Sequence, residues 1–193
     1  MKLRAFLFAT LFATLLPLHA QSGDKIVAAA RQQVGVTLGY DPAYVSLAYP
    51  NGDVPRDRGV CTDVLIRALR DGLATDLQKL VHEDMRGHFS AYPKQWGLSR
   101  PDPNIDHRRV PNLRTYFKRR GMELPLPKAG DDSGFRPGDI VTCTVPPNLP
   151  HVMIVSDRKS ATGRFLVIHN IGGGAHEEDS LLGFPVTGHY RWK

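Results

Sequence analysis

The sequence predicts an α+β fold in which a helical N-terminal lobe precedes an antiparallel C-terminal sheet. Apolar residues recur at helical spacing through the first half of the chain, whereas after residue 136 they alternate with the period of strands. The predicted strands follow one another with short connections, which favours antiparallel pairing. Because helices and strands are segregated along the chain, the α+β class is favoured over α/β.

Residues 1–20 are predicted to form a secretory signal peptide. Lys2 and Arg4 precede an apolar run, and the residues up to Ala20 resemble a small-residue cleavage site. The run is too short to span a bilayer comfortably, so no stable membrane anchor is expected. We therefore expect a periplasmic or secreted protein whose single domain covers residues 21–193.

Without Lys2 and Arg4 the chain has 25 − 2 = 23 basic and 19 acidic residues, a formal charge of +4. The basic residues are scattered and are not interleaved with aromatic ones, so no nucleic-acid partner is expected. The remaining 193 − 20 = 173 residues can bury roughly 70% of their unfolded surface, enough for a core without a disulfide scaffold. A monomer is expected.

Capping and stop residues bound the expected elements. Helices are predicted from the capping candidates at 22–24 to Gly35, from Val60 to Leu73, from Thr75 to Met85 and from Pro111 to Gly121. Strands are predicted at 140–145, 151–157, 165–170 and 186–192. Residues 40–58 are expected to form a long irregular segment, and long ordered loops are often functional.

Cys61 is the candidate nucleophile because it lies in the opening turn of a predicted helix. Backbone N–H groups and the helix dipole at such a position favour a thiolate and predict a lowered thiol pKa. Catalysis also requires a base and a group that orients it, usually distant in sequence. His151 and His169, on the predicted strands, are the natural candidates.

Hairpin arithmetic tests this pairing. If residues 158–162 form the loop, His151 falls opposite His169 on the same face of the sheet. A register shifted by one residue brings Asn170 opposite instead, so the orienting residue is His169 or Asn170, and His169 is favoured. A structural alternative makes Cys61 a buried apolar residue or half of a Cys61–Cys143 disulfide. We expect Cys143, inside a strand, to be reduced and noncatalytic.

The order of a helix-start Cys, Pro-Gly-Asp-Ile before a strand, His-Val-x-Ile-Val opening the next and then Val-Ile-His resembles the NlpC-type papain-like cell-wall cysteine peptidases. Motifs along nearly the whole chain are similar to a bacterial secreted family, domain of unknown function 1287. They are Tyr49-Pro-Asn-Gly-Asp-Val-Pro, Gly59-Val-Cys-Thr-Asp, His82-Glu-Asp-Met, Asn104-Ile-Asp-His-Arg and Val167-Ile-His-Asn-Ile-Gly.

The resemblance to the peptidases implies that Cys61 is the nucleophile, His151 the base and His169 the polar orienting residue. Tyr49, twelve positions before the nucleophile, matches a substrate-facing tyrosine that completes an oxyanion hole, and Asn170 is a second candidate there. One departure is that the peptidases have Asp-Cys-Ser and use it around a free peptide amine, whereas this chain has Val60-Cys-Thr. Cleavage beside a free amine is therefore not implied.

Several charged residues are candidates for lining the cleft and binding substrate. They are Asp53, Asp57, Asp84, Asp106, His107 and Arg108, of which the last four can instead form an ion-pair network between the lobe and the sheet. None has the spacing of a His-Glu-x-x-His or paired-Cys zinc site, so no metal and no cofactor are expected.

These observations predict a cysteine hydrolase, an amidase or peptidase, that acts on cell-wall peptide or a related envelope amide through a Cys-His-His site. An alternative is a noncatalytic envelope-binding module on the same fold. A third is an acyltransferase, since an acyl group on Cys61 can pass to an amine instead of water. No stable partner other than the peptidoglycan peptide or envelope amide substrate is expected.

Overall fold

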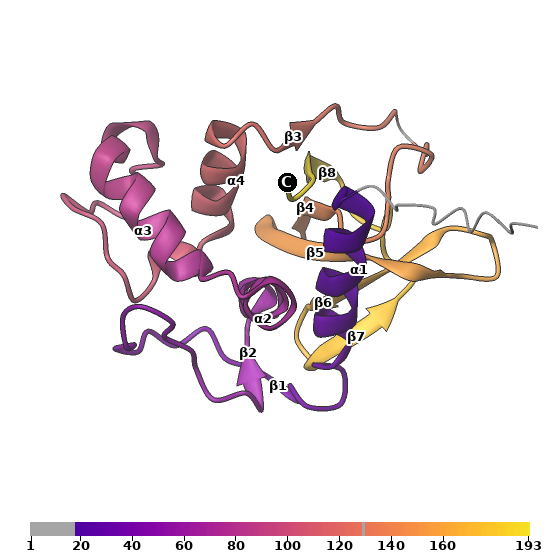
Figure 1. Cartoon of the computed structure of the whole chain (residues 1–193), viewed down its shortest axis with the longest axis horizontal. Coiled ribbons are helices and arrows are strands. Elements are labelled where there is room, and N and C mark those ends of the chain that lie inside the picture. Colours follow the sequence, from indigo (N-terminus) through magenta and orange to yellow (C-terminus); the bar gives the residue numbers. More distant parts are fainter. Residues whose placement is uncertain (1–17, 129) are drawn as a thin grey trace, which may run out of the picture.

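The computed structural model describes residues 18–128 and 130–193 (Figure 1). Its helices are α1 (Leu18–Arg31), α2 (Cys61–Leu73), α3 (Leu77–His88) and α4 (Val110–Arg119), with 3-10 turns at Phe89–Ala91 and Asp106–Arg108. The strands are β1 (Gly39–Tyr40), β2 (Arg58–Gly59), β3 (Glu123–Leu124), β4 (Ile140–Val145), β5 (Leu149–Lys159), β6 (Phe165–Asn170), β7 (Ala175–Glu178) and β8 (Val186–Tyr190). The predicted signal peptide lies outside the described residues, apart from its last three.

The strands β3 to β8 form one sheet in the order β3-β8-β4-β5-β6-β7, and every neighbouring pair is antiparallel. The two-residue strands β1 and β2 pair separately in parallel. The helices precede this sheet in the chain, so the predicted α+β class with an antiparallel C-terminal sheet is confirmed. None of the described helices is long and apolar enough to cross a membrane.

The predicted helices and strands are present with ends that differ by a few residues, the two-residue strands β1, β2 and β3 were not predicted, and the differences at α1, β5 and β7 have identifiable reasons. The helix α1 begins at Leu18 instead of at the capping candidates 22–24, because the residues before Ser22 are good helix formers that propagate a helix at little cost. The strand β5 is longer than predicted at both ends. The strand β7 was not predicted, because a turn was expected at the glycines 172–174 but no strand after them.

Alternating side chains along the central strands supply two apolar clusters, one on each face of the sheet. Val152 and Ile168 pack with residues of α1, α2 and α4, whereas Met153 and Val167 pack with Phe135 and other residues outside the helices. Figure 1 shows α2 in the centre, with α3 and α4 on one side and α1 with the sheet on the other. The start of α2 is therefore set against the sheet.

The long segment between α1 and α2 is irregular apart from β1 and β2, as expected, and one side chain fixes it. Arg67 of α2 is fully buried. Its guanidinium donates to the Asp53 carboxylate, to Thr37 Oγ1 and to three loop carbonyls, those of Val54, Pro55 and Arg58. The planar group thus holds the loop that leads into Cys61 against the helix.

We predict that Arg67→Met lowers the free energy of unfolding by about 3 to 5 kcal/mol, because it leaves several loop carbonyls without a donor and leaves the partly buried Asp53 with Arg70 alone as its close partner. Urea denaturation followed by circular dichroism measures the change. Lys79→Ala, which removes an exposed i,i+4 pair with Glu83, is the matched control and should leave the midpoint nearly unchanged. Equal midpoints for the two variants would contradict this role of Arg67.

Candidate active site

Cys61 is the first residue of α2, and it is only 5% exposed. The Asp63 carboxylate accepts the Val60 N–H at 2.7 Å, which fixes the turn that starts the helix. The backbone N–H groups of Val152, Thr62 and Cys61 itself favour the thiolate form of the side chain. The thiol therefore lies against Val152 of β5, the residue that follows the predicted base His151 in the chain.

The expected lowering of the Cys61 pKa is not found. Burial raises the pKa of the thiol to about 11, and the charge of Asp63 adds to the rise, although the N–H groups of Val152 and Thr62 act in the opposite direction. The helix terminus alone would lower this pKa, but the removal of the thiol from water has the larger effect. In the resting protein the group is a neutral thiol.

His151 on β5 and His169 on β6 are both buried and contact each other. His151 Nε2 lies 2.8 Å from His169 Nδ1, and His169 Nε2 lies 2.9 Å from Glu178 Oε1 on β7. The chain of hydrogen bonds runs across three neighbouring strands. It ends on a carboxylate whose side chain is 45% exposed.

The carboxylate sets the direction of these hydrogen bonds. Burial tends to raise the Glu178 pKa, but hydrogen bonds from His169 and Ser180 outweigh it and bring that pKa below its usual value. Burial lowers the pKa of His169, and it lowers the pKa of His151 to about 3, so both rings are neutral at pH 7.

An ionised carboxylate only accepts, so His169 carries its proton on Nε2 and accepts at Nδ1. His151 must then donate from Nε2 to His169, and its own Nδ1 keeps a lone pair. Glu178 thereby fixes the tautomers of both rings. The result is an imidazole whose second nitrogen is able to accept a proton.

The register predicted for β5 and β6 is wrong by two residues. Ile154 pairs with Ile168, so His151 is not directly opposite His169 but diagonal to it on the same face. A shift of two preserves the face, which is why the rings still meet. The difference arises because the turn lies later in the chain than predicted, with Lys159 paired with Phe165, and the irregularity between Val155 and Lys159 takes back part of that displacement.

Asn170 does not contact His151. Its amide nitrogen donates to the carbonyls of Gly39 and Gly59, and its oxygen accepts from Gly172 and Gly174. All four hydrogen-bonding positions of the amide are occupied. The side chain ties the β1–β2 pair, just before Cys61, to the edge of the sheet, so of the two predicted orienting residues His169 is the one in contact with the base.

Cys143 on β4 is directly opposite His151 in the antiparallel pairing. Both cysteines are free thiols. Burial raises the pKa of Cys143 to about 12, and the charge of Cys61 adds to the rise, which shows that the two sulfurs are near each other. The Cys61–Cys143 disulfide considered as an alternative is not formed.

A groove of about 260 Å³ opens beside Cys61. Tyr40, Trp96 and Pro150 are among the residues that line it, together with Cys61 itself. Burial raises the pKa of Tyr40 to about 12, and the charges of Cys61 and Asp63 add to the rise, so its hydroxyl stays protonated. The tyrosine that faces the thiol is therefore Tyr40.

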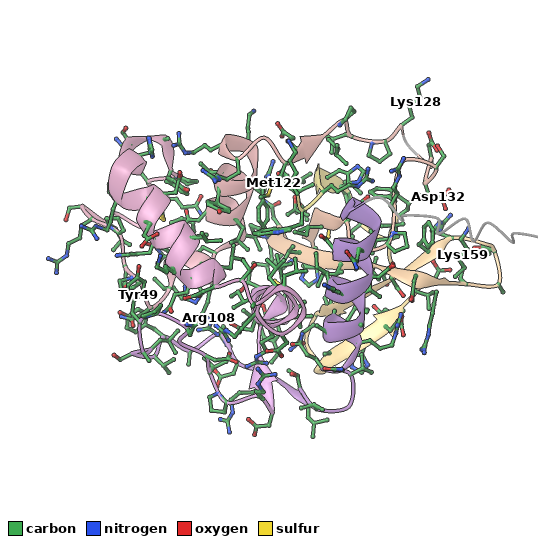
Figure 2. All side chains as sticks on the ribbon, in the orientation of Figure 1. Tyr49, Arg108, Met122, Lys128, Asp132 and Lys159 are labelled. Carbon is green, nitrogen blue, oxygen red and sulfur yellow. The ribbon has the colours of Figure 1, made fainter. Side chains whose placement is uncertain are left out.

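Tyr49, predicted to be substrate-facing, lies elsewhere. It is 42% exposed, its ring contacts His82 of α3 at 5.1 Å between centroids, and it is not among the lining residues (Figure 2). The spacing from the nucleophile pointed to the wrong tyrosine because residues 41–57 form a long loop that carries Tyr49 away from Cys61. The pairing of β1 with β2 places Tyr40 beside Gly59, two residues before Cys61, so a prediction of that pairing would have identified Tyr40 as the tyrosine near the thiol.

Of the six predicted substrate-binding residues, only Arg108 lines the groove. Its guanidinium forms a bidentate pair with Asp63, at 2.9 Å for both Nε and Nη2, and donates to the carbonyls of Asp41 and Ala43. This pair joins the start of α2 to the loop after Tyr40. Arg108 is thus primarily the ion-pair partner of Asp63, and it also forms part of the groove lining.

The other five predicted residues do not line the groove. Four of them pair with other groups of the protein, and the fifth, His107, is buried. Asp53 pairs with Arg67 and Arg70, Asp57 pairs with its neighbour Arg58, and Asp84 binds Arg119 and Tyr92. Asp106 accepts the Asp102 N–H inside its turn. His107 is 2% exposed, and burial lowers its pKa to about 3. Their assignment to the cleft is corrected, because none of these five side chains lines the groove beside Cys61.

Glu178 was missed by the sequence reasoning. It lies on the unpredicted strand β7, where it pairs with Val167 and so faces the same side as His169. The signal was present, since a hairpin about the glycines 172–174 places residues 176 and 178 on that face. Within residues 18–128 and 130–193 no group of three or more His, Cys, Asp or Glu side chains is arranged to hold a metal.

The fold and the site define an α+β protein with a buried thiol at the start of a helix, packed against β5, and two hydrogen-bonded histidines on β5 and β6 of an antiparallel sheet. The chain belongs to the family called domain of unknown function (DUF1287), whose model matches residues 27–192. This confirms the family predicted from the motifs. The uncharacterized protein YijF of Escherichia coli (strain K12) is 53% identical over 179 residues, which cover 93% of this chain and 86% of YijF.

Two solved structures share the fold. Both are crystal structures of a N-acetylmuramoyl-L-alanine amidase from Bacteroides uniformis, with TM-scores of 0.57 and 0.55. Each covers 90% of this chain and 100% of the amidase chain at 12% sequence identity. At this identity the likeness concerns the arrangement of helices and strands.

We predict that alkylation of Cys61 by iodoacetamide is slower than that of free cysteine at pH 8 and still rises about tenfold per pH unit between pH 8 and 10. The reason is that only the thiolate reacts and the Cys61 pKa is raised well above the usual 8.5. Mass spectrometry of the Cys143→Ala variant isolates the signal of Cys61. A rate that levels off below pH 8 would show that the helix terminus dominates and burial does not.

Proposed function

We propose that this protein is a thiol amidase or peptidase of the bacterial envelope, with the NlpC-type papain-like fold, that acts on cell-wall peptide or a related amide. Cys61 is the nucleophile and His151 the base. His169 and Glu178 are positioning residues. The domain at residues 21–193 is released from the signal peptide 1–20 into the periplasm or the medium.

The observation that carries the proposal is the ordered chain from Glu178 through His169 to His151. It supplies a neutral imidazole with a lone pair on Nδ1, on the residue that precedes Val152, whose backbone N–H favours the Cys61 thiolate. A base within reach of a thiol and oriented by a third group is the arrangement that nucleophilic catalysis requires. Packing alone does not require that the two rings have defined tautomers, whereas proton transfer from the thiol does.

The proposed reaction begins with attack of the sulfur on the amide carbonyl carbon, while the thiol proton moves to His151 Nδ1. The resulting imidazolium is stabilised through His169 by the Glu178 carboxylate. Breakdown of the tetrahedral intermediate breaks the C–N bond, and His151 returns the proton to the leaving nitrogen. Water then attacks the acyl-thioester with His151 as base, which releases the carboxylate and regenerates the thiol.

The oxyanion of the intermediate has two proposed donors. One is the backbone N–H of Cys61, which has no partner within the helix because it belongs to the first turn. The other is the hydroxyl of Tyr40, which lines the groove and remains protonated because its pKa is raised. Donors held in place before the reaction stabilise charge that develops only in the transition state.

The substrate class is supported by the structural neighbours, which are named as N-acetylmuramoyl-L-alanine amidases. The groove beside Cys61 is of a size to accept one or two residues of a peptide-like chain. A noncatalytic envelope-binding module is the second candidate. It is favoured by one observation, the burial and raised pKa of the Cys61 thiol in the resting state.

Incubation of purified muropeptides with the wild type, followed by mass spectrometry, tests the proposal. We predict cleavage by the wild type and by Cys143→Ala, which removes the second thiol without burying a hydroxyl. Cys61→Ala should lower turnover by at least about a thousandfold, because it removes the nucleophile. Turnover by Cys61→Ala at the wild-type rate would contradict the thiol mechanism, and binding without cleavage by the wild type would favour the module.

We predict that Glu178→Gln lowers kcat on the order of 10-fold to 100-fold with little change in KM, because a neutral amide neither fixes the two tautomers nor stabilises the imidazolium. Glu177→Gln is the matched control, since that neighbour pairs with Arg31 outside the relay, and it should retain kcat. Nitrogen-15 NMR of the histidine rings provides a readout that a purely structural role would not move. Unchanged ring signals and kcat in Glu178→Gln would refute the relay.

A further inference from the structure

The groove beside Cys61 is lined mainly by groups without charge. Pro42, Ile105, Val110, Pro111 and Pro150 supply apolar walls, and Trp96 adds an aromatic face. Of the lining residues in the described part of the chain, only Arg108 carries a formal charge. A ligand that enters the groove therefore exchanges water for largely apolar contacts.

The charge of Arg108 is neutralised before any ligand arrives. Asp63, whose side chain is 4% exposed, accepts two of its N–H groups, and two more go to the carbonyls of Asp41 and Ala43. An arginine has five N–H groups, which leaves one on Nη1. The groove thus offers a hydrogen-bond donor at this edge and no net positive charge.

The carboxylates around the groove are occupied as well. Asp63 receives the Val60 N–H in addition to Arg108. Asp41 accepts the Ala43 N–H and faces Arg58, while Asp106 is buried and holds the Asp102 N–H and Arg109. An ammonium group placed beside Cys61 would lose water, and each nearby carboxylate already holds a hydrogen-bond donor or an arginine.

We propose, on the basis of the thiol amidase function above, that the acyl part of the substrate carries no free amine next to the scissile bond. The acyl group is neutral, such as an amino acid residue whose nitrogen is itself acylated. Its blocking carbonyl accepts the remaining N–H of Arg108, and its apolar surface lies on the proline and tryptophan walls. The bond cleaved is therefore internal to a larger molecule and not adjacent to a free N-terminus.

Protection of Cys61 from iodoacetamide tests this without requiring turnover. The probes are alanyl-glutamate peptides that differ only in acetylation of the N-terminal amine. At pH 6.5 the acetylated peptide should protect Cys61 at a concentration at least tenfold lower than the concentration of the free-amine peptide that gives the same protection. At pH 9.5, above the usual amine pKa of about 8, the difference should shrink because the free amine is neutral. Equal protection at pH 6.5, no protection by either peptide, or a preference independent of pH would overturn the inference.

A matched pair of variants at Val60 tests the charge argument directly. Val60 lines the groove at the N-cap of α2, where both Asp and Asn are favourable. Val60→Asp should improve protection by the free-amine peptide at least tenfold at pH 6.5, and Val60→Asn should not. If Val60→Asp fails to fold, the wild-type pH comparison still decides. Protection without cleavage of either peptide or of muropeptides would overturn the amidase proposal and leave this inference standing.

Discussion

The geometry around the thiol depends on one buried carboxylate. Asp63 accepts the Val60 N–H before the helix and pairs with Arg108 from a distant turn. Arg108 in turn holds the carbonyls of Asp41 and Ala43, which follow the groove residue Tyr40. A buried ion pair contributes little net stability, but loss of one partner leaves an uncompensated charge, so such a pair selects one arrangement of its elements. Here the arrangement includes the nucleophile, a groove wall and Tyr40.

Burial has a second consequence, because it makes the site a chain of neutral groups. Loss of water disfavours the charged forms of Cys61, His151 and His169 alike. Glu178 is the exception, since burial of its half-exposed side chain raises its pKa less than the hydrogen bonds from His169 and Ser180 lower it, so it keeps its charge at the outer end of the chain. One charge at the solvent edge can thereby order two buried rings, because each neutral imidazole must donate from one nitrogen and accept at the other.

The sequence was sufficient for features that depend on local pattern. The class of fold, the strands at Ile140–Val145 and Phe165–Asn170, and the placement of Cys61 at a helix start follow from periodicity and turn residues. The shared face of His151 and His169 was predicted because it depends only on parity, while their register was not, because it depends on where the hairpin turn falls between Lys159 and Phe165 and on the irregularity beside it. The pKa of Cys61, the partner of Asp63 and the position of Tyr40 depend on contacts between distant segments, which no local pattern contains.

The conflict between the helix terminus and burial at Cys61 is resolved by magnitudes. A helix N-terminus favours an adjacent anion by about 0.3 to 2 kcal/mol, whereas removing a charged group from water costs several kcal/mol even after relaxation. The thiol pKa therefore rises although the backbone N–H groups of Val152, Thr62 and Cys61 favour the thiolate. On the proposed mechanism those donors contribute little to the resting thiol and more to the negative charge that grows as the proton leaves for His151. Interactions that strengthen only along the reaction raise kcat without tightening binding of the ground state, so a buried neutral thiol at a helix terminus is compatible with catalysis.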